Sequence, residues 1–187
     1  MTNVKKVIAV LVMGFSVSTA ANATDGTISF NGTISSVTCS INGSTPNGAA
    51  NMTVGLPTVD ASALTSAGAI AGTTPFQIVL GKSGEATCNN GSIAKVQFET
   101  GAGVDTATGM LNNTASNAPA GNVKVAVLNA DDFSQIMVGS ASPNNHASAT
   151  IAANQGTLNY IAAYKAPTGG ATAGAVTASV AYSVVYN

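Results

Sequence analysis

The 187-residue chain contains no tryptophan and no arginine, and it has one histidine, two cysteines and 7% charged residues. Without arginine or a cluster of lysines it offers no basic surface for phosphates, so we expect no nucleic-acid partner. The single histidine, His146, lies in a polar segment, and the cysteines lack close ligand spacing, so we expect no metal site and no cofactor. Since there is also no nucleophile motif and no paired-carboxylate arrangement, we do not expect an enzyme.

The first 23 residues have the features of a secretory signal peptide. Lys5 and Lys6 precede an apolar run over residues 7–17, which is shorter than the roughly 20 residues that span a bilayer. Small residues follow in an A-x-A arrangement, which predicts cleavage between Ala23 and Thr24. The mature chain then has 187 − 23 = 164 residues, the size of one domain, and four lysines against seven acids give it a net charge of 4 − 7 = −3.

The two cysteines, Cys39 and Cys88, both lie in the exported part of the chain. An even number of cysteines in an oxidising compartment indicates one disulfide, here closing a loop of 88 − 39 = 49 residues. Two separate buried thiols are the alternative.

Short apolar or alternating segments separated by turn residues indicate an antiparallel β-sandwich. A Gly- and Ala-containing stretch over residues 60–72 is expected to be a loop, and Asn89 to Gly91 have the chemistry of a hairpin turn between two strands. The expected strands are 51–57, 76–80, 93–99, 122–128, 133–138, 157–165 and 175–187.

Both ends of the mature chain alternate with a period of two. Near the N-terminus, Ile28, Phe30, Gly32 and Ile34 share one side, as expected of a half-buried strand. Read locally, this strand could pair within its own domain or fill a gap in another copy. At the C-terminus the residues that share one face are Val180, Tyr182, Val184 and Tyr186.

The two ends together resemble the structural pilins of the chaperone/usher pathway, close to type 1 fimbrial major subunits. The resemblance is carried by the sequence DGTISFNGTI at residues 25–34, the Thr38-Cys39 pair, the distant Cys88 and the ending AYSVVYN at residues 181–187. It implies an all-β fold: an incomplete immunoglobulin-like sandwich that lacks its last strand and is completed in trans by a donor strand. The implied organisation is a signal peptide (1–23), an N-terminal donor-strand extension (24–36) and a pilin domain (37–187).

The resemblance also implies roles for particular residues. The donor strand would present Gly26, Ile28, Phe30, Gly32 and Ile34 to a neighbour. The last strand would border the open groove and be held by a chaperone through Val180, Tyr182, Val184, Tyr186 and Asn187.

The implied function is that of a structural subunit of an extracellular fimbria that polymerises by donor-strand exchange and supports adhesion. Its partners would be other copies of itself in a filament, a periplasmic chaperone, an outer-membrane usher, and tip or adaptor subunits. The chain would reach the cell surface through the periplasm. A minor or adaptor subunit and a self-contained secreted β-sandwich binding module are the alternatives, and the second would require the N-terminal arm to fold back on its own sheet.

Overall fold

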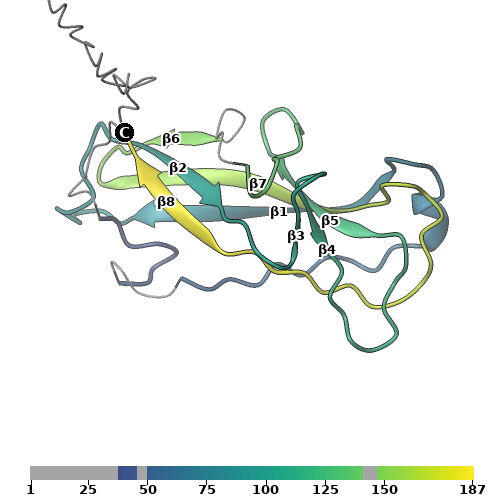
Figure 1. Cartoon of the computed structure of the whole chain (residues 1–187). Helices are drawn as coiled ribbons and strands as arrows, with labels where there is room; N and C mark the ends of the chain where they lie inside the picture. The colour runs from purple at the N-terminus through teal and green to yellow at the C-terminus, as the bar shows by residue number, and fades with distance from the viewer. Residues whose placement is uncertain (1–37, 46–49, 141–146) are drawn as a thin grey trace, which may run out of the picture. The chain divides into compact units, whose positions relative to one another are not determined.

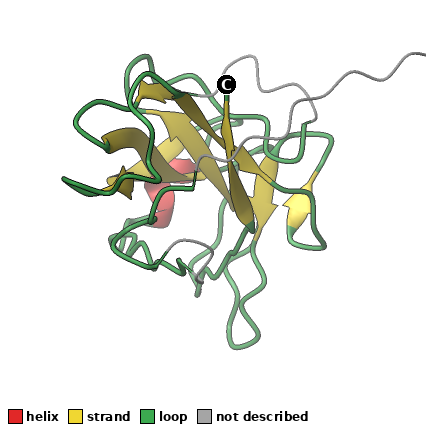
Figure 2. Cartoon of the chain, turned by 90° about the vertical axis from the view of Figure 1, so that its left-hand side faces the viewer, coloured by secondary structure: helices red, strands yellow, loops and turns green. Residues whose placement is uncertain are grey.

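The computed structural model describes residues 38–45, 50–140 and 147–187. The expected signal peptide, its cleavage site, the donor-strand extension and His146 all lie outside these residues. Within the described part, the chain forms strands, connecting loops and one short 3-10 helix, η1 (Ala61–Leu64) (Figure 2). No helix among the described residues is long and apolar enough to cross a membrane.

The strands form two sheets, as expected of a sandwich (Figure 1). One sheet has five strands in the order β1-β7-β5-β4-β3, and the other has three in the order β6-β2-β8. The strands are β1 (Ile70–Gly81), β2 (Ile93–Phe98), β3 (Val104–Asp105), β4 (Met110–Asn112), β5 (Lys124–Asn129), β6 (Ser148–Thr150), β7 (Gln155–Lys165) and β8 (Tyr182–Tyr186).

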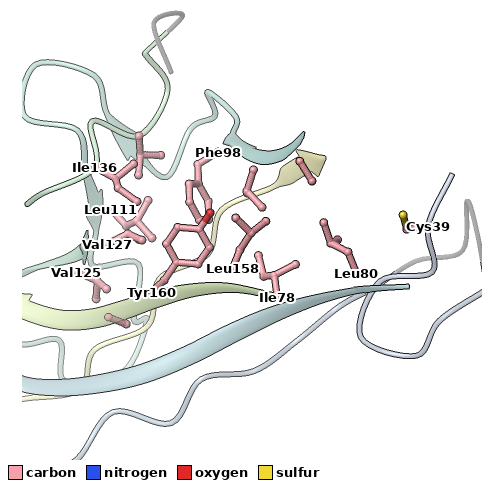
Figure 3. Packing of buried hydrophobic residues seen from close by; sticks show 14 of the residues in the cluster. Cys39, Ile78, Leu80, Phe98, Leu111, Val125, Val127, Ile136, Leu158 and Tyr160 are labelled. Carbon is pink, nitrogen blue, oxygen red and sulfur yellow. The ribbon is translucent and has the colours of Figure 1, made fainter. Parts of the chain in front are cut away.

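The main core lies between the sheets, and Tyr160 of β7 is at its centre. The Tyr160 ring lies 5.3 Å from the Phe98 ring of β2 in an edge-to-face arrangement (Figure 3). It also lies 5.5 Å from the Phe76 ring of β1, the strand that pairs with β7 in the same sheet. The contact with Phe98 joins the two sheets and helps to hold them in one relative position. The Tyr160 hydroxyl is buried and has no hydrogen-bond partner among the described residues.

The predicted disulfide is present: Cys39 and Cys88 are joined with an S–S distance of 2.04 Å. Both cysteines are buried in the main core. The bond ties the start of the described chain to the turn that precedes β2, across 49 residues of sequence.

β1 forms one edge of the five-stranded sheet and pairs only with β7 among the named strands. Its register shifts between Ala71 and Thr74, and Pro75 follows at once. Because proline has no backbone N–H and a bulge interrupts the ladder, this edge is a poor template for another strand.

Three of the expected strands are absent or much shorter than predicted. Residues 51–57 form no strand, and residues 133–138 make only a single bridge, between Gln135 and Leu128. The expected strand over 175–187 is restricted to Tyr182–Tyr186. The alternation in these segments places apolar side chains toward the core, but most of their backbone has no neighbouring strand within the described residues.

The hairpin expected at Asn89 to Gly91 is also wrong. The chain does turn there, with Gly91 at φ +86°, but β1 and β2 belong to different sheets and do not pair. The loop expected over residues 60–72 contains η1 and the first residues of β1. Strands β3, β4 and β6 were not predicted, because two or three residues are too few to establish a period.

Candidate functional site

Among the residues that the structure describes, the backbone of β8 is hydrogen-bonded along one edge only. Ile93 and Asn187 exchange two backbone hydrogen bonds of 2.9 Å, and the Glu99 amide donates to the Ala181 carbonyl, so these residues face β2. Opposed residues of an antiparallel pair alternate between hydrogen-bonded and non-hydrogen-bonded positions. The amides and carbonyls of Tyr182, Val184 and Tyr186 therefore face away from β2, where no described residue bonds to them.

The side chains of this segment alternate over a longer range than the strand itself. From residue 176 to residue 187, every even-numbered residue is half-buried and every odd-numbered residue is exposed. The half-buried side chains all pack against the main core: Val176, Ala178, Val180, Tyr182, Val184 and Tyr186. Apolar side chains that point toward a core and yet stay half exposed indicate that the core is incomplete beside them.

A second extended segment forms the opposite wall. Val54 and Leu56 are half-buried against the same core, while Thr53, Gly55 and Pro57 are exposed. In Figure 1 this segment runs past β8 on the side away from β2. We call the space between the two segments the β8 groove. Its walls are residues 50–59 and 176–186.

A cavity of about 430 Å³ lies where the two walls approach η1. Val59 of one wall and Val176 of the other both line it, together with Leu64, Val123 and Tyr164. The β8 groove therefore ends in a partly apolar cavity that an apolar side chain could enter.

One tyrosine connects the two walls of the groove: the Tyr182 hydroxyl donates to the Ala50 carbonyl at 2.7 Å. Burial raises the pKa of the Tyr182 and Tyr186 phenols, so both stay protonated at neutral pH.

The segment around Cys39 is fixed by Glu85 as well as by the disulfide. The Glu85 carboxylate accepts hydrogen bonds from the Ser40 amide at 2.5 Å and from the Ser40 hydroxyl at 2.6 Å. The hydrogen bond from the Ser40 side chain is the main reason that the pKa of Glu85 lies below its usual value of 4.5.

This lowered pKa predicts a pH effect on stability. Because the folded-state pKa of Glu85 lies below its unfolded value, its contribution is present above about pH 4.5 and is lost as the pH falls through the folded-state pKa. Glu85→Gln is expected to be less stable at pH 7 and to lose less stability between pH 5 and pH 3. Urea unfolding across this range measures both; an unchanged slope in Glu85→Gln would show that other acids carry the effect.

The structure describes the residues predicted for the last strand, and their role at a groove or chaperone stays a prediction. Tyr182, Val184 and Tyr186 lie on β8, Val180 precedes the strand, and Asn187 follows it in the ladder with β2. The five donor-strand residues, from Gly26 to Ile34, lie outside the described residues, so their role stays a prediction. The sequence reasoning did not identify Val54 and Leu56 as a groove wall, although their alternation was visible.

The described sandwich belongs to a known class, immunoglobulin-like sandwiches that lack a strand. A chaperone-usher pilus subunit of known structure matches it with a TM-score of 0.56 at 20% identity, covering 91% of this chain and all of that one. A type I fimbria protein of Burkholderia pseudomallei matches with a TM-score of 0.53 at 30% identity, over 81% of this chain and 91% of that one.

Sequence comparison gives the family. The model for type-1 fimbrial protein, A, matches residues 56–187. The major fimbrial subunit SMF-1 of Stenotrophomonas maltophilia is 42% identical over 174 residues, 90% of this chain and 96% of that protein. Fimbrial protein FimX of Bordetella pertussis is 37% identical over 194 residues, with 91% and 92% covered. The chain belongs to the type-1 fimbrial protein family and is a structural subunit of a surface fimbria.

Proposed function

We propose that the β8 groove is the acceptor site for residues 24–36 of a neighbouring copy, and that the subunit polymerises by donor-strand exchange. The observation that carries this proposal is the backbone of β8, bonded on one edge only above a row of half-buried apolar side chains. An added strand would complete the ladder and cover that row, which is the mode of recognition called β-strand addition.

The N-terminal arm has the side chains for this task. Ile28, Phe30 and Ile34 fall on one side of its period-two pattern, and burying them would contribute about 5 to 9 kcal/mol, an upper estimate because a free arm is not fully exposed. Gly32 lies on the same side and lets the backbone approach closely at that point.

Donation between copies gives the assembly its form. Arm and groove are different surfaces, so each contact is heterologous and does not close on itself, which yields a filament. Before assembly the same groove would be covered by a periplasmic chaperone that also holds the Asn187 end, and the exchange would occur at an outer-membrane usher. Tip or adaptor subunits would use the same contact. This route requires removal of residues 1–23 between Ala23 and Thr24.

Competition by a synthetic arm tests the proposal. The mature chain, residues 24–187, is unfolded in guanidinium and returned to buffer with an excess of a peptide of residues 25–36. The peptide is expected to raise the unfolding midpoint and to stop the growth of large assemblies in light scattering, because it fills grooves without offering a new one.

A matched pair of peptides provides the control. Phe30→Asp places a charge on the side that faces the groove and is expected to abolish both effects. Asn31→Asp adds the same charge one residue along, on the other side, and is expected to preserve them. Equal activity of the two peptides, or no effect of the native peptide, would contradict donor-strand exchange and favour a self-contained sandwich.

A further inference from the structure

The Asn113 side chain, just after β4, makes four hydrogen bonds to backbone groups. Its amide nitrogen donates to the Ala120 carbonyl at 3.0 Å and to the Ala175 carbonyl at 2.9 Å. Its amide oxygen accepts from the Ala115 amide at 3.1 Å and from the Thr177 amide at 3.0 Å. An asparagine amide has two donor hydrogens and two acceptor positions, so its full hydrogen-bonding capacity is used here.

Two of these bonds fix the backbone on either side of Val176. The Ala175 carbonyl belongs to the peptide group before Val176, and the Thr177 amide belongs to the peptide group after it. The Thr114 amide also donates to the Thr177 carbonyl, at 2.8 Å. In a sheet, a neighbouring strand would bond such groups, but this segment belongs to no named strand. Asn113 therefore supplies through its side chain the restraint that a neighbouring strand would give.

These bonds occupy the edge of the segment that an added strand would not use. Further along the chain, Ala181 and Asn187 bond to β2, so the odd-numbered residues share that edge. Ala175 and Thr177 are also odd-numbered, and they face the same way in an extended segment. The backbone of Val176 therefore points toward the side that β8 leaves free.

β8 alone is too short for the whole donor arm. The strand has five residues, whereas the donor-strand residues from Gly26 to Ile34 cover nine positions (26–34). The row of half-buried side chains extends the same face back from Tyr186 to Val176, which is eleven positions (176–186). An arm that pairs along its full apolar length therefore needs the segment before β8 as well, and needs it extended.

The same side chain joins two loops at the cavity beside η1. Ala120 and Ala175, whose carbonyls accept from Asn113, both line this cavity of about 430 Å³. The two loops approach so closely that a Cβ atom at Gly174 would lie 2.4 Å from the Ala120 nitrogen. One residue thus holds both a side of the cavity and the first part of the acceptor edge.

We propose that Asn113 is a positioning residue that extends the acceptor edge beyond β8, so that one end of the donor arm pairs beside Val176. This inference rests on the proposed function, because the extension matters only if an arm enters. Without the four bonds, the segment before β8 would lose its extended form, and the arm end beside it would lose its backbone partner and its apolar cover. The centre of the arm, beside β8, would keep both.

The test measures how firmly each part of the arm is held. The mature chain, residues 24–187, and its Asn113→Ala variant are each refolded with an excess of fluorescein-labelled peptide of residues 25–36. Release of the captured peptide at a fixed guanidinium concentration is followed by fluorescence anisotropy. Three further peptides carry one alanine each, in place of Ile28, Phe30 or Ile34.

The expected result is a selective loss at one end of the arm. On the unaltered chain, each of the three alanine peptides is expected to be released at least about tenfold faster than the native peptide. On Asn113→Ala, one of Ile28→Ala and Ile34→Ala is expected to lose most of this effect, and the direction of the arm decides which. Phe30→Ala is expected to keep its effect. A domain that is merely less stable would release all peptides faster in the same proportion.

Asn112→Ala is the matched control. It removes the same amide from the preceding residue, which pairs through its backbone with Lys124 of β5, and is expected to behave as the unaltered chain does. Asn113→Asp keeps the two bonds that residue 113 accepts and loses the two that it donates. It takes the place of Asn113→Ala if that variant does not refold, with the same selective loss expected.

Three outcomes would overturn the role of Asn113. They are undiminished effects of all three alanine peptides on the Asn113 variant, a loss of the Phe30→Ala effect together with the terminal ones, and the same selective loss in Asn112→Ala. Failure of the unaltered chain to retain the native peptide would instead refute donor-strand exchange, and the role of Asn113 with it.

Discussion

Replacement of Cys39 and Cys88 by serine is expected to lower the free energy of unfolding by about 4 kcal/mol. The disulfide closes a loop of 49 residues, and cross-linking a loop of this length removes that much conformational entropy from the unfolded chain in the chain-entropy model. Both positions are buried, so the serine hydroxyl groups would add a further cost. Guanidinium unfolding of the variant and the unaltered chain measures the difference.

Reduction supplies the control for this prediction. A thiol reductant is expected to bring the unaltered chain close to the stability of the Cys39→Ser, Cys88→Ser variant and to leave that variant unaffected. Retention of full stability after reduction would show that packing around Cys39 holds this segment without the bond.

Gly81→Ala is expected to destabilise the domain by about 3 kcal/mol. Gly81 ends β1 with φ +68°, a conformation that costs an L-residue about 1 to 2 kcal/mol. A Cβ atom there would also lie 2.1 Å from the Asn154 carbonyl oxygen and 2.6 Å from the Cys88 sulfur, and relief of such overpacking costs about 1 to 3 kcal/mol.

Gly84→Ala separates the two causes. Gly84 has a similar φ of +79°, but a Cβ atom there would meet nothing within 4 Å. The Gly84→Ala variant is expected to lose only about 1 kcal/mol of stability, which is the cost of the backbone conformation alone. Urea unfolding of the two variants side by side gives the cost of the clash as their difference. An equal loss in both would mean that the backbone near Asn154 moves aside.

The sequence predicted well the long strands in the interior of the five-stranded sheet. β5 and β7 lie inside the five-stranded sheet, and their apolar runs were visible because both faces are buried from Tyr160 to Ala163 and from Val125 to Leu128. The disulfide was predicted from the even number of cysteines in an exported chain. The all-β class was predicted from the short segments separated by turn residues. These features depend on composition and local pattern, which a single sequence displays.

The errors have one physical origin. Alternation of apolar residues reports which side of an extended chain faces a core, and it does not report whether a backbone partner lies alongside. Residues 51–57 and 175–181 alternate as strands do, yet neither segment belongs to a named strand, and residues 175–181 make only scattered backbone hydrogen bonds. The wrong hairpin at Asn89 to Gly91 has a similar cause. Turn residues are recognised from the local sequence, whereas the sheet that each flanking strand joins is decided by contacts with distant parts of the chain. The Tyr182 to Ala50 bond, 132 residues apart, carried no local signal.

The irregular edge of the sheet at β1 has a consequence for how the protein can aggregate. Of the four edges that the two sheets have within the described residues, β3 and β6 have only two and three residues, and β1 is interrupted by a register shift and Pro75. Among these four edge strands, β8 alone offers an uninterrupted ladder of five residues to another chain. A molecule with two such edges could recruit strands on both sides and stack into cross-β material, as amyloid does. With one edge receptive, extension stays linear, and a high local concentration of subunits is tolerated without sideways growth.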